Sequence, residues 1–285
     1  MIPPKNKPHF SINCKGELID LTTPKVMGIL NITPDSFYDG GRFKDSKSVL
    51  DQVEKMLVEG ATFIDLGAYS SRPGADFVSV DEELKRIVPV VALILKVFPD
   101  CIISIDSFRS RVAMECAAVG ASICNDISAG KLDPKMMETV GQLKMPYIMM
   151  HMKGTPQNMH KQTDYKHLIT DIYHYFSERI QLAKEHRITD LILDLGFGFA
   201  KTTEQNYKLL RHMEFFSNLN LPMLTGVSRK SMIYKVLDCT AAEALNGTTA
   251  LHMMALANGS KILRVHDVKQ AQECVQLYNV LVKDN

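Results

Sequence analysis

Short runs of apolar residues recur along the chain, and most of them end in polar residues. They cover residues 26–33, 62–68, 101–107, 122–128, 146–152, 190–196, 222–228 and 261–266. Runs of this kind, separated by longer segments, predict strands that are buried on both faces, as in a parallel sheet with right-handed crossovers. Eight such units favour an α/β fold of the closed (β/α)₈ type, the TIM barrel.

The longer segments between the runs have helical periodicity. They cover residues 45–59, 80–98, 110–119, 134–144, 165–186, 203–219 and 241–258, and a last one covers 268–282. Gly60, Gly120 and Gly259 follow three of them, where a left-handed C-terminal cap is expected. Residues 10–21 alternate loosely around Lys15-Gly16, which predicts an N-terminal β-hairpin that covers the bottom of the barrel.

No low-complexity linker divides the 285 residues, so we predict a single domain over residues 1–285. The competing architecture is an open, doubly wound sheet. Its dinucleotide-binding form requires Gly-x-Gly-x-x-Gly after the first strand, and the chain has no such motif there. Gly196 and Gly198 come after the sixth predicted strand and lack the third glycine. The barrel is therefore favoured.

Composition and charge exclude several classes of partner. A formal net charge of +1 gives no reason to expect nucleic acid or a membrane surface. The first ten residues lack the apolar centre of a signal peptide, and the longest apolar run, 87–98, is too short to span a bilayer. We therefore expect a cytoplasmic protein. The six cysteines form no Cys-x-x-Cys pair and are expected to be reduced and structural.

Polar residues lie at the ends of the predicted strands, where TIM barrels carry their chemistry. They are Asn31, Asp65, Asp106, Asn125 with Asp126, His151, Asp194, the run Ser228-Arg229-Lys230, and Arg264 with His266. Asp65, Asp106 and Asp194 lie within strongly apolar strands, where an unpaired carboxylate is costly to desolvate. For a single buried carboxylate, hydrogen bonds from the protein itself are a sufficient explanation. Three of them, with cations at equivalent ends, favour a site for a polar, donor-rich heterocycle next to an anion.

The cations indicate which anion. Arg264 and His266 are two residues apart on one predicted strand, so they share a face that suits a phosphate or pyrophosphate. Lys230 lies at the start of a predicted helix whose free N–H groups favour a carboxylate or phosphate, with Ser231 as a plain N-cap the alternative. Arg72 lies in a loop between a strand and a helix, and a solvated loop arginine is the alternative there.

Residues 26–43 combine a strand with a loop. The apolar run carries Asn31 near its end, Pro34 stops it, and Gly40-Gly41 lets the following loop bend. A rigid strand that delivers a polar side chain to the foot of a flexible loop is a common design of closing active sites, and an ordinary connection to a helix is the alternative. We expect residues 34–41 to become ordered only when substrate binds.

The motifs of the chain resemble those of the dihydropteroate synthase family. They are MGILNITPDSFYDGG (27–41), IDLGAYSSRPGA (64–75), SIDS (104–107), NDIS (125–128), MMHMKG (149–154), DLGFGFAK (194–201), GVSRKS (226–231) and RVHDV (264–268). They run in family order across nearly the whole chain. The resemblance implies a homodimeric (β/α)₈ barrel of the folate pathway. Such an enzyme joins 7,8-dihydropterin-6-ylmethyl diphosphate to p-aminobenzoate and releases pyrophosphate, with Mg²⁺ assisting.

The resemblance also implies a role for individual residues. Pterin contacts fall on Asp106, Asn125, Ile127, Met150, Asp194, Gly226, Lys230 and Arg264. Diphosphate contacts fall on Asn31, Asp65, Arg264 and His266, and Asn31 also reaches the metal. The p-aminobenzoate contacts are Phe37, Ser71, Arg72, Pro73, Phe199, Lys230 and Ser231. The residues expected to act in catalysis are Asn31, Asp35, Arg72, Lys230, Arg264 and His266. Sulfonamides, which mimic p-aminobenzoate, are expected to inhibit competitively.

The implied chemistry agrees with the residues. Carboxylates of Asp106 and Asp194 can accept from the amino and ring N–H groups of an aminopyrimidinone. Arg264 and His266 would stabilise the leaving diphosphate, whose loss leaves a cation that the pterin delocalises. The weakly basic amine of p-aminobenzoate then attacks, so no strong enzyme base is needed. Sparse protein ligation suits Mg²⁺, which keeps waters and binds substrate phosphate oxygens.

The sequence departs from the family pattern in places. Leu195 replaces a proline and Ala200 replaces a glycine of the motif DPGFGFGK, which leaves the path of that loop open. Tyr69-Ser70-Ser71 stands where Glu-Ser-Thr is usual. Ser71 keeps the hydroxyl, whereas nothing in the sequence accounts for Tyr69.

Two other functions compete with the synthase. A pterin-binding methyltransferase domain that serves a corrinoid protein would not require the Ser-Arg-Pro-Gly loop or the Arg-Val-His strand. A binding protein that has lost catalysis is disfavoured by the intact set Asn31, Asp35, Arg72, Lys230, Arg264 and His266.

Overall fold

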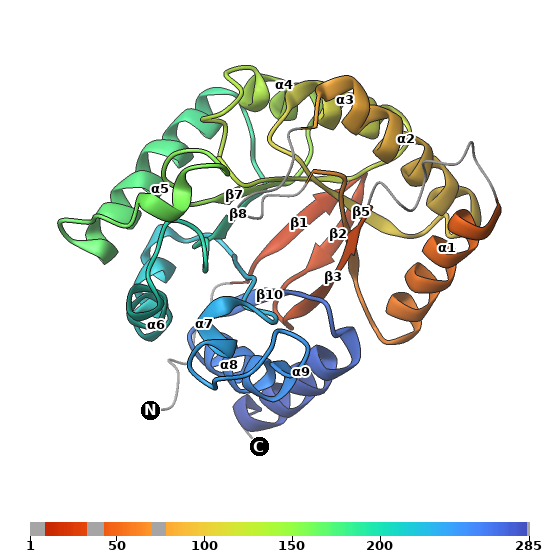
Figure 1. Ribbon diagram of the computed structural model, residues 1–285. Helices are drawn as coiled ribbons and strands as arrows, with labels where there is room; N and C mark the ends of the chain where they lie inside the picture. Colours follow the sequence, from red (N-terminus) through yellow and green to blue (C-terminus); the bar gives the residue numbers. More distant parts are fainter. Residues whose placement is uncertain (1–8, 33–42, 70–77, 284–285) are drawn as a thin grey trace.

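The strands of the computed structural model close into a barrel, and the helices lie around it (Figure 1). The structure describes residues 9–32, 43–69 and 78–283. The eight barrel strands are parallel and follow the order β10-β3-β4-β5-β6-β7-β8-β9. They are β3 (Lys25–Asn31), β4 (Phe63–Gly67), β5 (Ile102–Asp106), β6 (Ile123–Asp126), β7 (Tyr147–Met150), β8 (Leu191–Asp194), β9 (Met223–Thr225) and β10 (Ser260–Val265). Each predicted apolar run overlaps one strand, so the predicted TIM barrel is confirmed.

The helices largely follow the predicted periodicity. They are α1 (Phe43–Val58), α2 (Val80–Val97), α3 (Ser110–Ala118), α4 (Met136–Leu143), α5 (Leu168–Glu185), α6 (Thr203–Arg211), α7 (Ser231–Tyr234), α8 (Leu245–Ala257) and α9 (Val268–Val282), with short 3₁₀ helices η2 (Met159–Lys161) and η3 (Met213–Leu219). Gly60, Gly120 and Gly259 follow helices with φ of +98°, +117° and +96°, as expected for left-handed caps.

One helix prediction is wrong in its second half. The helix expected over residues 203–219 ends as α6 at Arg211, and residues 213–219 form the 3₁₀ helix η3. Met213 and Phe216 are both fully buried, and they are three residues apart. A 3₁₀ helix has three residues per turn, so it places both side chains on one face, whereas an α-helix would turn them about 60° apart. Packing of these two residues therefore decides the local geometry.

The predicted hairpin is formed by β1 (Ser11–Cys14) and β2 (Glu17–Asp20), which pair antiparallel. Lys15 and Gly16 between them both have positive φ, as a two-residue type I′ turn requires. Ile12, Cys14, Ile19 and Leu21 are buried in one apolar cluster with residues of seven barrel strands: Met27, Phe63, Ile123, Ile148, Ile192, Leu224 and Ile262. The hairpin therefore closes the amino-terminal end of the barrel.

The apolar layer under the hairpin determines where the polar layer lies. Side chains alternate between the two faces of a strand, so residues two positions apart share a face. Asp65, Asn125, Asp194 and Arg264 each follow a member of the apolar layer by two residues. They therefore form the next layer inside the barrel, on the side of the carboxyl ends of the strands.

Two further features bear on the expected class of protein. Within the described residues, no helix is long and apolar enough to cross a bilayer. The six cysteines carry free thiols, and all but Cys239 are buried.

The packing of the hairpin can be tested by removing one of its buried side chains. Leu21 is fully buried, so Leu21→Ala is expected to lower the free energy of unfolding by about 2–5 kcal/mol. Leu18, on the same hairpin, is 70% exposed, and Leu18→Ala is expected to change that free energy by less than about 0.5 kcal/mol. Urea unfolding measures both variants, and equal losses would contradict the role of the hairpin as a plug.

Candidate active site

Arg264 in β10 lies at the centre of the polar layer. Its Nε donates to Oδ2 of Asp65 at 2.6 Å, and its Nη2 donates to Oδ2 of Asp106 at 2.6 Å. The side-chain amide of Asn125 donates to the same Oδ2 of Asp65 at 3.1 Å. Side chains from β10, β4, β5 and β6 are thus joined across the barrel interior. Arg264 supplies the donor that the carboxylates of Asp65 and Asp106 were predicted to need.

The electrostatics of this cluster follow from burial and opposite charge. Burial opposes the charge of Arg264, but the carboxylates of Asp65 and Asp106 outweigh it and raise the pKa of Arg264 well above its usual value. Burial raises the pKa of Asp106 to about 7, although the guanidinium of Arg264 opposes the shift. Asp65 is fully buried, and its Oδ1 has no hydrogen-bond partner within the described part of the chain. The cluster therefore retains capacity to accept hydrogen bonds.

Asp194 and Lys230 form a second pair of opposite charges. Asp194 ends β8 and accepts a hydrogen bond from the backbone N–H of Gly196 at 2.8 Å. Burial raises the pKa of Asp194, opposed first by the charge of Lys230. Burial lowers the pKa of Lys230 to about 8, and Asp194 opposes that shift. Lys230 Nζ also donates to the carbonyl of Phe197 at 2.5 Å and lies 4.5 Å from the ring centroid of Phe199.

The structure shows how the loop after β8 holds the two residues that depart from the family motif. Ala200 has φ of +50°, a left-handed conformation that glycine adopts without the cost of about 1 kcal/mol borne by other residues. Leu195 is fully buried, so the residue in place of proline packs in the core. The hydroxyl of Tyr165 donates to the carbonyl of Ala200 at 2.8 Å, which helps to hold the strained residue.

Lys201 and His151 hold the same loop, and no role was predicted for Lys201. Lys201 Nζ donates to the carbonyls of Gly196 at 2.9 Å and Phe199 at 3.1 Å, and lies 3.0 Å from Nδ1 of His151. Burial lowers the pKa of Lys201 to about 7 and that of His151 well below its usual value. A lysine directly after a glycine-containing loop was the only indication in the sequence. The acceptors of Lys201 are backbone carbonyls, which cannot be identified from residue types.

Asp126 belongs to the framework rather than to the open site. Its carboxylate accepts from the N–H and hydroxyl of Ser128, each at 2.7 Å, from the N–H of Gly130 at 2.7 Å and from the hydroxyl of Tyr147 at 2.6 Å. Burial raises the pKa of Asp126, and the Tyr147 hydroxyl opposes that shift. Protein donors therefore satisfy this carboxylate, unlike that of Asp65.

Asn31 and His266 lie at the rim of the barrel. Asn31 ends β3 and is exposed. A Cβ added to Gly67 would lie 3.7 Å from Asn31 Oδ1 and 3.6 Å from Asp106 Oδ2, so this glycine leaves space between the two side chains. His266 follows β10, and its Nδ1 lies 3.1 Å from the hydroxyl oxygen of Ser228.

The other residues predicted to contact a substrate lie near Arg264, Lys230 or Phe199, as far as the structure describes them. Gly226 leaves open the space between Arg264 and Lys230, because an added Cβ would lie 3.9 Å from Arg264 Cβ and from Lys230 Nζ. Ile127 and Met150 are buried in an apolar cluster against which Phe199 packs.

Ser231 is the first residue of α7, and Lys230 occupies the N-cap position. The alternative in which Ser231 is a plain N-cap is therefore wrong. Asp35, Phe37, Ser71, Arg72, Pro73 and the loop 34–41 lie outside the described residues.

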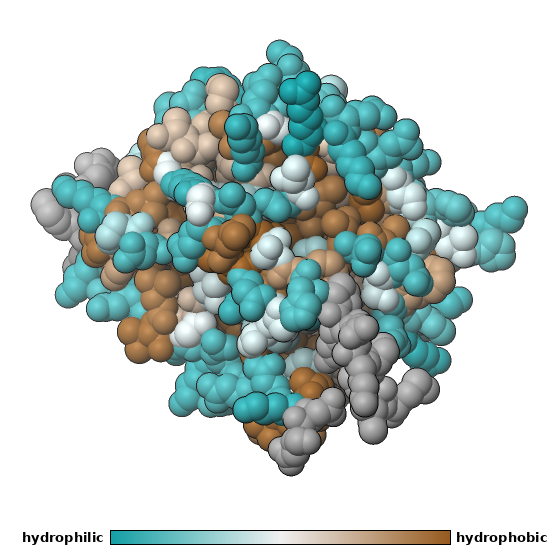
Figure 2. Space-filling model, turned by 180° about the vertical axis from the view of Figure 1, so that it is seen from behind, coloured by the Kyte–Doolittle hydropathy of each residue, from teal (hydrophilic) through white to brown (hydrophobic). Residues whose placement is uncertain are grey.

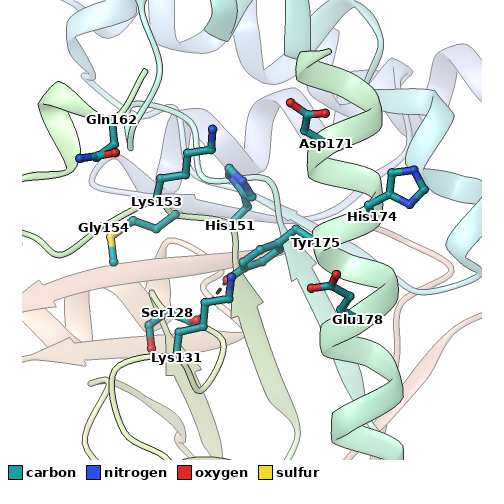
Figure 3. Close-up of a pocket in the computed structure, with 11 residues that line it drawn as sticks. Ser128, Lys131, His151, Lys153, Gly154, Gln162, Asp171, His174, Tyr175 and Glu178 are labelled. Carbon is teal, nitrogen blue, oxygen red and sulfur yellow. Dashed lines mark hydrogen bonds between the residues drawn. The ribbon is translucent and has the colours of Figure 1, made fainter. Parts of the chain in front are cut away.

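A hollow of about 520 Å³ lies against α5 and is also lined by residues that follow β6 and β7 (Figure 3). Tyr175 points into it from α5, and its hydroxyl donates to the carbonyl of Ser128 at 3.1 Å. His151 also lines this hollow, together with charged residues of both signs: Lys131, Lys153, Asp171 and Glu178. The mixed charge gives it no preference for an anion or a cation.

Comparisons with known proteins agree with the fold. Residues 27–266 match the family described as pterin binding enzyme. A dihydropteroate synthase from Haemophilus influenzae is 43% identical, over 94% of this chain and 98% of the relative. The Yersinia pestis enzyme, solved in a sulfonamide drug complex, has a TM-score of 0.89 and 39% identity and covers 95% of this chain and 99% of its own. The Xanthomonas albilineans enzyme, solved with 4-aminobenzoic acid, has a TM-score of 0.88 and 32% identity and covers 96% and 99%.

Fold and family match together define the class as a barrel enzyme of the pterin-binding kind. The relatives and the solved structures narrow that class to one reaction type. The chain belongs to the dihydropteroate synthase family, which consists of transferases of the folate pathway.

The difference between Asp126, which protein donors satisfy, and Asp194, which accepts one backbone bond, can be tested by measuring the free energy of unfolding of variants. Asp126→Ala leaves the fully buried Tyr147 hydroxyl and two backbone N–H groups without their acceptor, so the free energy of unfolding is expected to fall by about 3 kcal/mol or more. Asp194→Asn keeps the shape of a side chain that accepts one backbone bond, and a loss of about 1 kcal/mol is expected. Urea unfolding measures both, and similar losses would contradict the contrast.

Proposed function

We propose that the chain condenses 7,8-dihydropterin-6-ylmethyl diphosphate with p-aminobenzoate to give 7,8-dihydropteroate and pyrophosphate. The observation that carries the proposal is the polar layer, where Asp106 and Arg264 lie beside Asp194 and Lys230. This layer combines acceptors for a donor-rich heterocycle with cations for an anionic group. The family membership of the chain supports the same reaction.

The pterin is assigned to the interior of the polar layer. Carboxylates of Asp106 and Asp194 would accept from its amino and ring N–H groups, which offsets the cost of keeping these carboxylates away from water. Asn125 is held by Asp65 and would present its remaining amide groups to the ring. The buried side chain of Met150 supports contact with one flat face of the pterin.

The diphosphate is assigned to the rim, near Arg264, His266 and Asn31. The bond between the pterin methylene carbon and the diphosphate oxygen breaks first, and its electron pair leaves on the oxygen. Fixed positive charge stabilises that oxygen, because Arg264 is already oriented by two carboxylates. The amine of p-aminobenzoate then forms the new C–N bond and loses a proton to pyrophosphate or water. No strong enzyme base is required.

A Mg²⁺ ion is part of the proposal. Within the described residues, no group of three or more His, Cys, Asp or Glu side chains could hold a metal. The exposed amide oxygen of Asn31, next to the space left by Gly67, is a suitable single ligand for an ion that keeps waters and binds substrate phosphate oxygens. When bound, the ion would neutralise charge on the leaving diphosphate.

The p-aminobenzoate is assigned to the apolar ring of Phe199, the ammonium of Lys230 and the start of α7 at Ser231. The known complex of the Xanthomonas albilineans relative with 4-aminobenzoic acid supports this substrate, and the sulfonamide complex of the Yersinia pestis relative supports inhibition by such drugs. Contributions from Asp35, Phe37, Ser71, Arg72 and Pro73 stay predictions, since these residues lie outside the described part of the chain.

We also propose that the chain acts as a homodimer of single-domain subunits in the cytoplasm. Large apolar side chains are exposed on neighbouring helices, with Met254 of α8 50% exposed and Leu277, Val280 and Leu281 of α9 61%, 74% and 74% exposed. Figure 2 shows apolar residues on the surface at the lower edge of the molecule, where α9 ends. Exposed apolar residues grouped in this way support a protein interface.

The function is tested by pyrophosphate release. Purified protein with Mg²⁺, the pterin diphosphate and p-aminobenzoate is expected to release one pyrophosphate per dihydropteroate formed. Asp194→Asn is the matched variant, because it keeps the side-chain shape but presents an amide to the pterin. It is expected to weaken binding of the pterin diphosphate about tenfold or more in calorimetry. No turnover by folded wild-type protein would refute the function, and unchanged pterin affinity would remove Asp194 from the site.

The lowered pKa of Lys230 predicts a pH dependence. A pKa of about 8 means that the ammonium is lost as pH rises through 8, rather than near the usual value for lysine. The charged fraction falls from about nine-tenths at pH 7 to about one-tenth at pH 9, so kcat/KM for p-aminobenzoate is expected to fall over that window. Lys230→Arg stays charged there. Its normalised pH profile should lack this fall, and an identical fall in the variant would assign it to another group.

A further inference from the structure

Two neighbouring residues after β9 contact two neighbouring residues after β10. The hydroxyl oxygen of Ser228 accepts from the backbone N–H of His266 at 3.2 Å and lies 3.1 Å from Nδ1 of its ring. The guanidinium of Arg229 donates to both carboxylate oxygens of Asp267, through Nε at 2.8 Å and Nη2 at 2.9 Å. The two loops are thus joined by two successive contacts, and His266, which the proposed function assigns to the diphosphate, takes part in one of them.

Asp267 occupies a position where an aspartate ordinarily has a local role. It is the N-cap residue of α9, and an aspartate there usually accepts a hydrogen bond from the backbone N–H groups of the first turn. The carboxylate makes no such bond, although the whole of α9 is described. Both of its oxygens instead bind the fork of Arg229. Helix capping therefore does not explain this aspartate, and its partner is the loop after β9.

Arg229 is anchored on its other sides by α8 and by the chain just before that helix. Its backbone N–H donates to the hydroxyl oxygen of Thr248 at 3.0 Å, and Thr248 is 1% exposed. Its Nη1 donates to the carbonyls of Ala241, at 2.9 Å, and Ala242. These bonds hold Arg229 at φ of +53°, a left-handed conformation that costs a residue other than glycine about 1–2 kcal/mol. The guanidinium therefore offers Asp267 a fixed partner.

The ion pair between Arg229 and Asp267 is partly buried, with 23% and 20% of the two side chains exposed. Pairs near the surface usually contribute about 1 kcal/mol or less to stability, because water screens the charges. The geometry of the pair is more informative than its energy. The planar guanidinium binds both carboxylate oxygens at once, which fixes the direction of the carboxylate. Loss of the pair should therefore disturb the local geometry without unfolding the protein.

We propose that Asp267, bound by Arg229, is a positioning residue for the diphosphate group, because it holds the backbone next to His266 and so keeps the ring against Ser228. The inference rests on the proposed function, which places the diphosphate near His266. Asp267 itself does not touch the substrate. An imidazole whose orientation is set beforehand loses less freedom when the leaving group binds, and electrostatic stabilisation of that group depends on such preorganisation.

A double-mutant cycle with His266 tests this route. Asp267→Asn keeps the shape of the side chain but loses the charge that binds the guanidinium, and it is expected to lower kcat/KM for the pterin diphosphate about tenfold. His266→Ala alone is expected to lower kcat/KM about a hundredfold. In the His266→Ala background, Asp267→Asn is expected to change kcat/KM by less than about twofold, because the group that it positions is absent.

The cycle separates His266 from other groups nearby. Arg264 lies in the strand that Asp267 follows, and Lys230 follows Arg229 in the loop, so either could pass on a disturbance. Both side chains are still present in the His266→Ala background. A disturbance that reached the substrate through either of them, or a general loss of structure, would lower kcat/KM about tenfold in that background as well.

Binding of inorganic pyrophosphate in the presence of Mg²⁺, measured by calorimetry, gives the same comparison without turnover. Asp267→Asn is expected to weaken this binding about fivefold when His266 is present and by less than about twofold in the His266→Ala background.

Asp81→Asn is the matched control. Asp81 binds Arg111 at 2.7 Å, and both side chains are largely exposed, 71% and 57%. The control is expected to change neither kcat/KM nor pyrophosphate binding by more than about twofold. If Asp267→Asn does not fold, Arg229→Lys takes its place in the cycle, since it keeps the charge of Arg229 and loses the fork.

The possible outcomes are distinct. An effect of Asp267→Asn that disappears when His266 is absent supports the inference. No effect when His266 is present, or an equal effect in both backgrounds, would overturn it while wild-type turnover still supports the proposed function. Absence of pyrophosphate release by folded wild-type protein would refute the proposed function itself, and the inference with it.

Discussion

The guanidinium of Arg264 between Asp65 and Asp106 is the interaction on which the open end of this barrel depends. The two carboxylates lie inside a ring of apolar strands and repel each other, and that of Asp65 is fully buried, so a fixed positive partner stabilises both. Arg264 is long enough to cross from β10 to β4 and β5 and serve both. Without it, the two carboxylates would be left unpaired in the interior, a condition that typically costs several kcal/mol. The same bonds hold Arg264 in one orientation, which electrostatic catalysis requires.

The hairpin at the other end makes this arrangement possible. Ile12 and Leu21 seal the amino-terminal end with apolar side chains, so water and ligands reach the polar layer from the carboxyl ends of the strands. Strand alternation then fixes the order of the layers, with an apolar layer below and a polar layer above. The bottom of the barrel contributes stability, while the top carries groups that are costly to bury. The stability that the hairpin contributes at one end of the barrel offsets the cost of burying polar groups at the other end.

Most of the fold and part of the site could be predicted from the sequence, for identifiable reasons. Strands buried on both faces leave unbroken apolar runs, and an aspartate such as Asp65 inside such a run indicates a site directly. Lys201 escaped prediction because its partners are mostly backbone carbonyls that tertiary packing brings close to it. The 3₁₀ helix η3 was missed because the burial of Met213 and Phe216, not local propensity, determines its geometry.

The number of protein donors around each buried carboxylate separates framework from site. Asp126 accepts four hydrogen bonds from protein groups and holds the loop after β6. Asp194 accepts one backbone bond, and Oδ1 of Asp65 has no partner within the described residues. All three lie at comparable depth in apolar strands, so their sequence surroundings are alike. A carboxylate that the protein leaves incompletely satisfied retains free energy that only a ligand with matching donors can recover. Incomplete satisfaction at Asp194 is therefore the physical basis of the proposed pterin binding, and full satisfaction at Asp126 holds the loop after β6 in place.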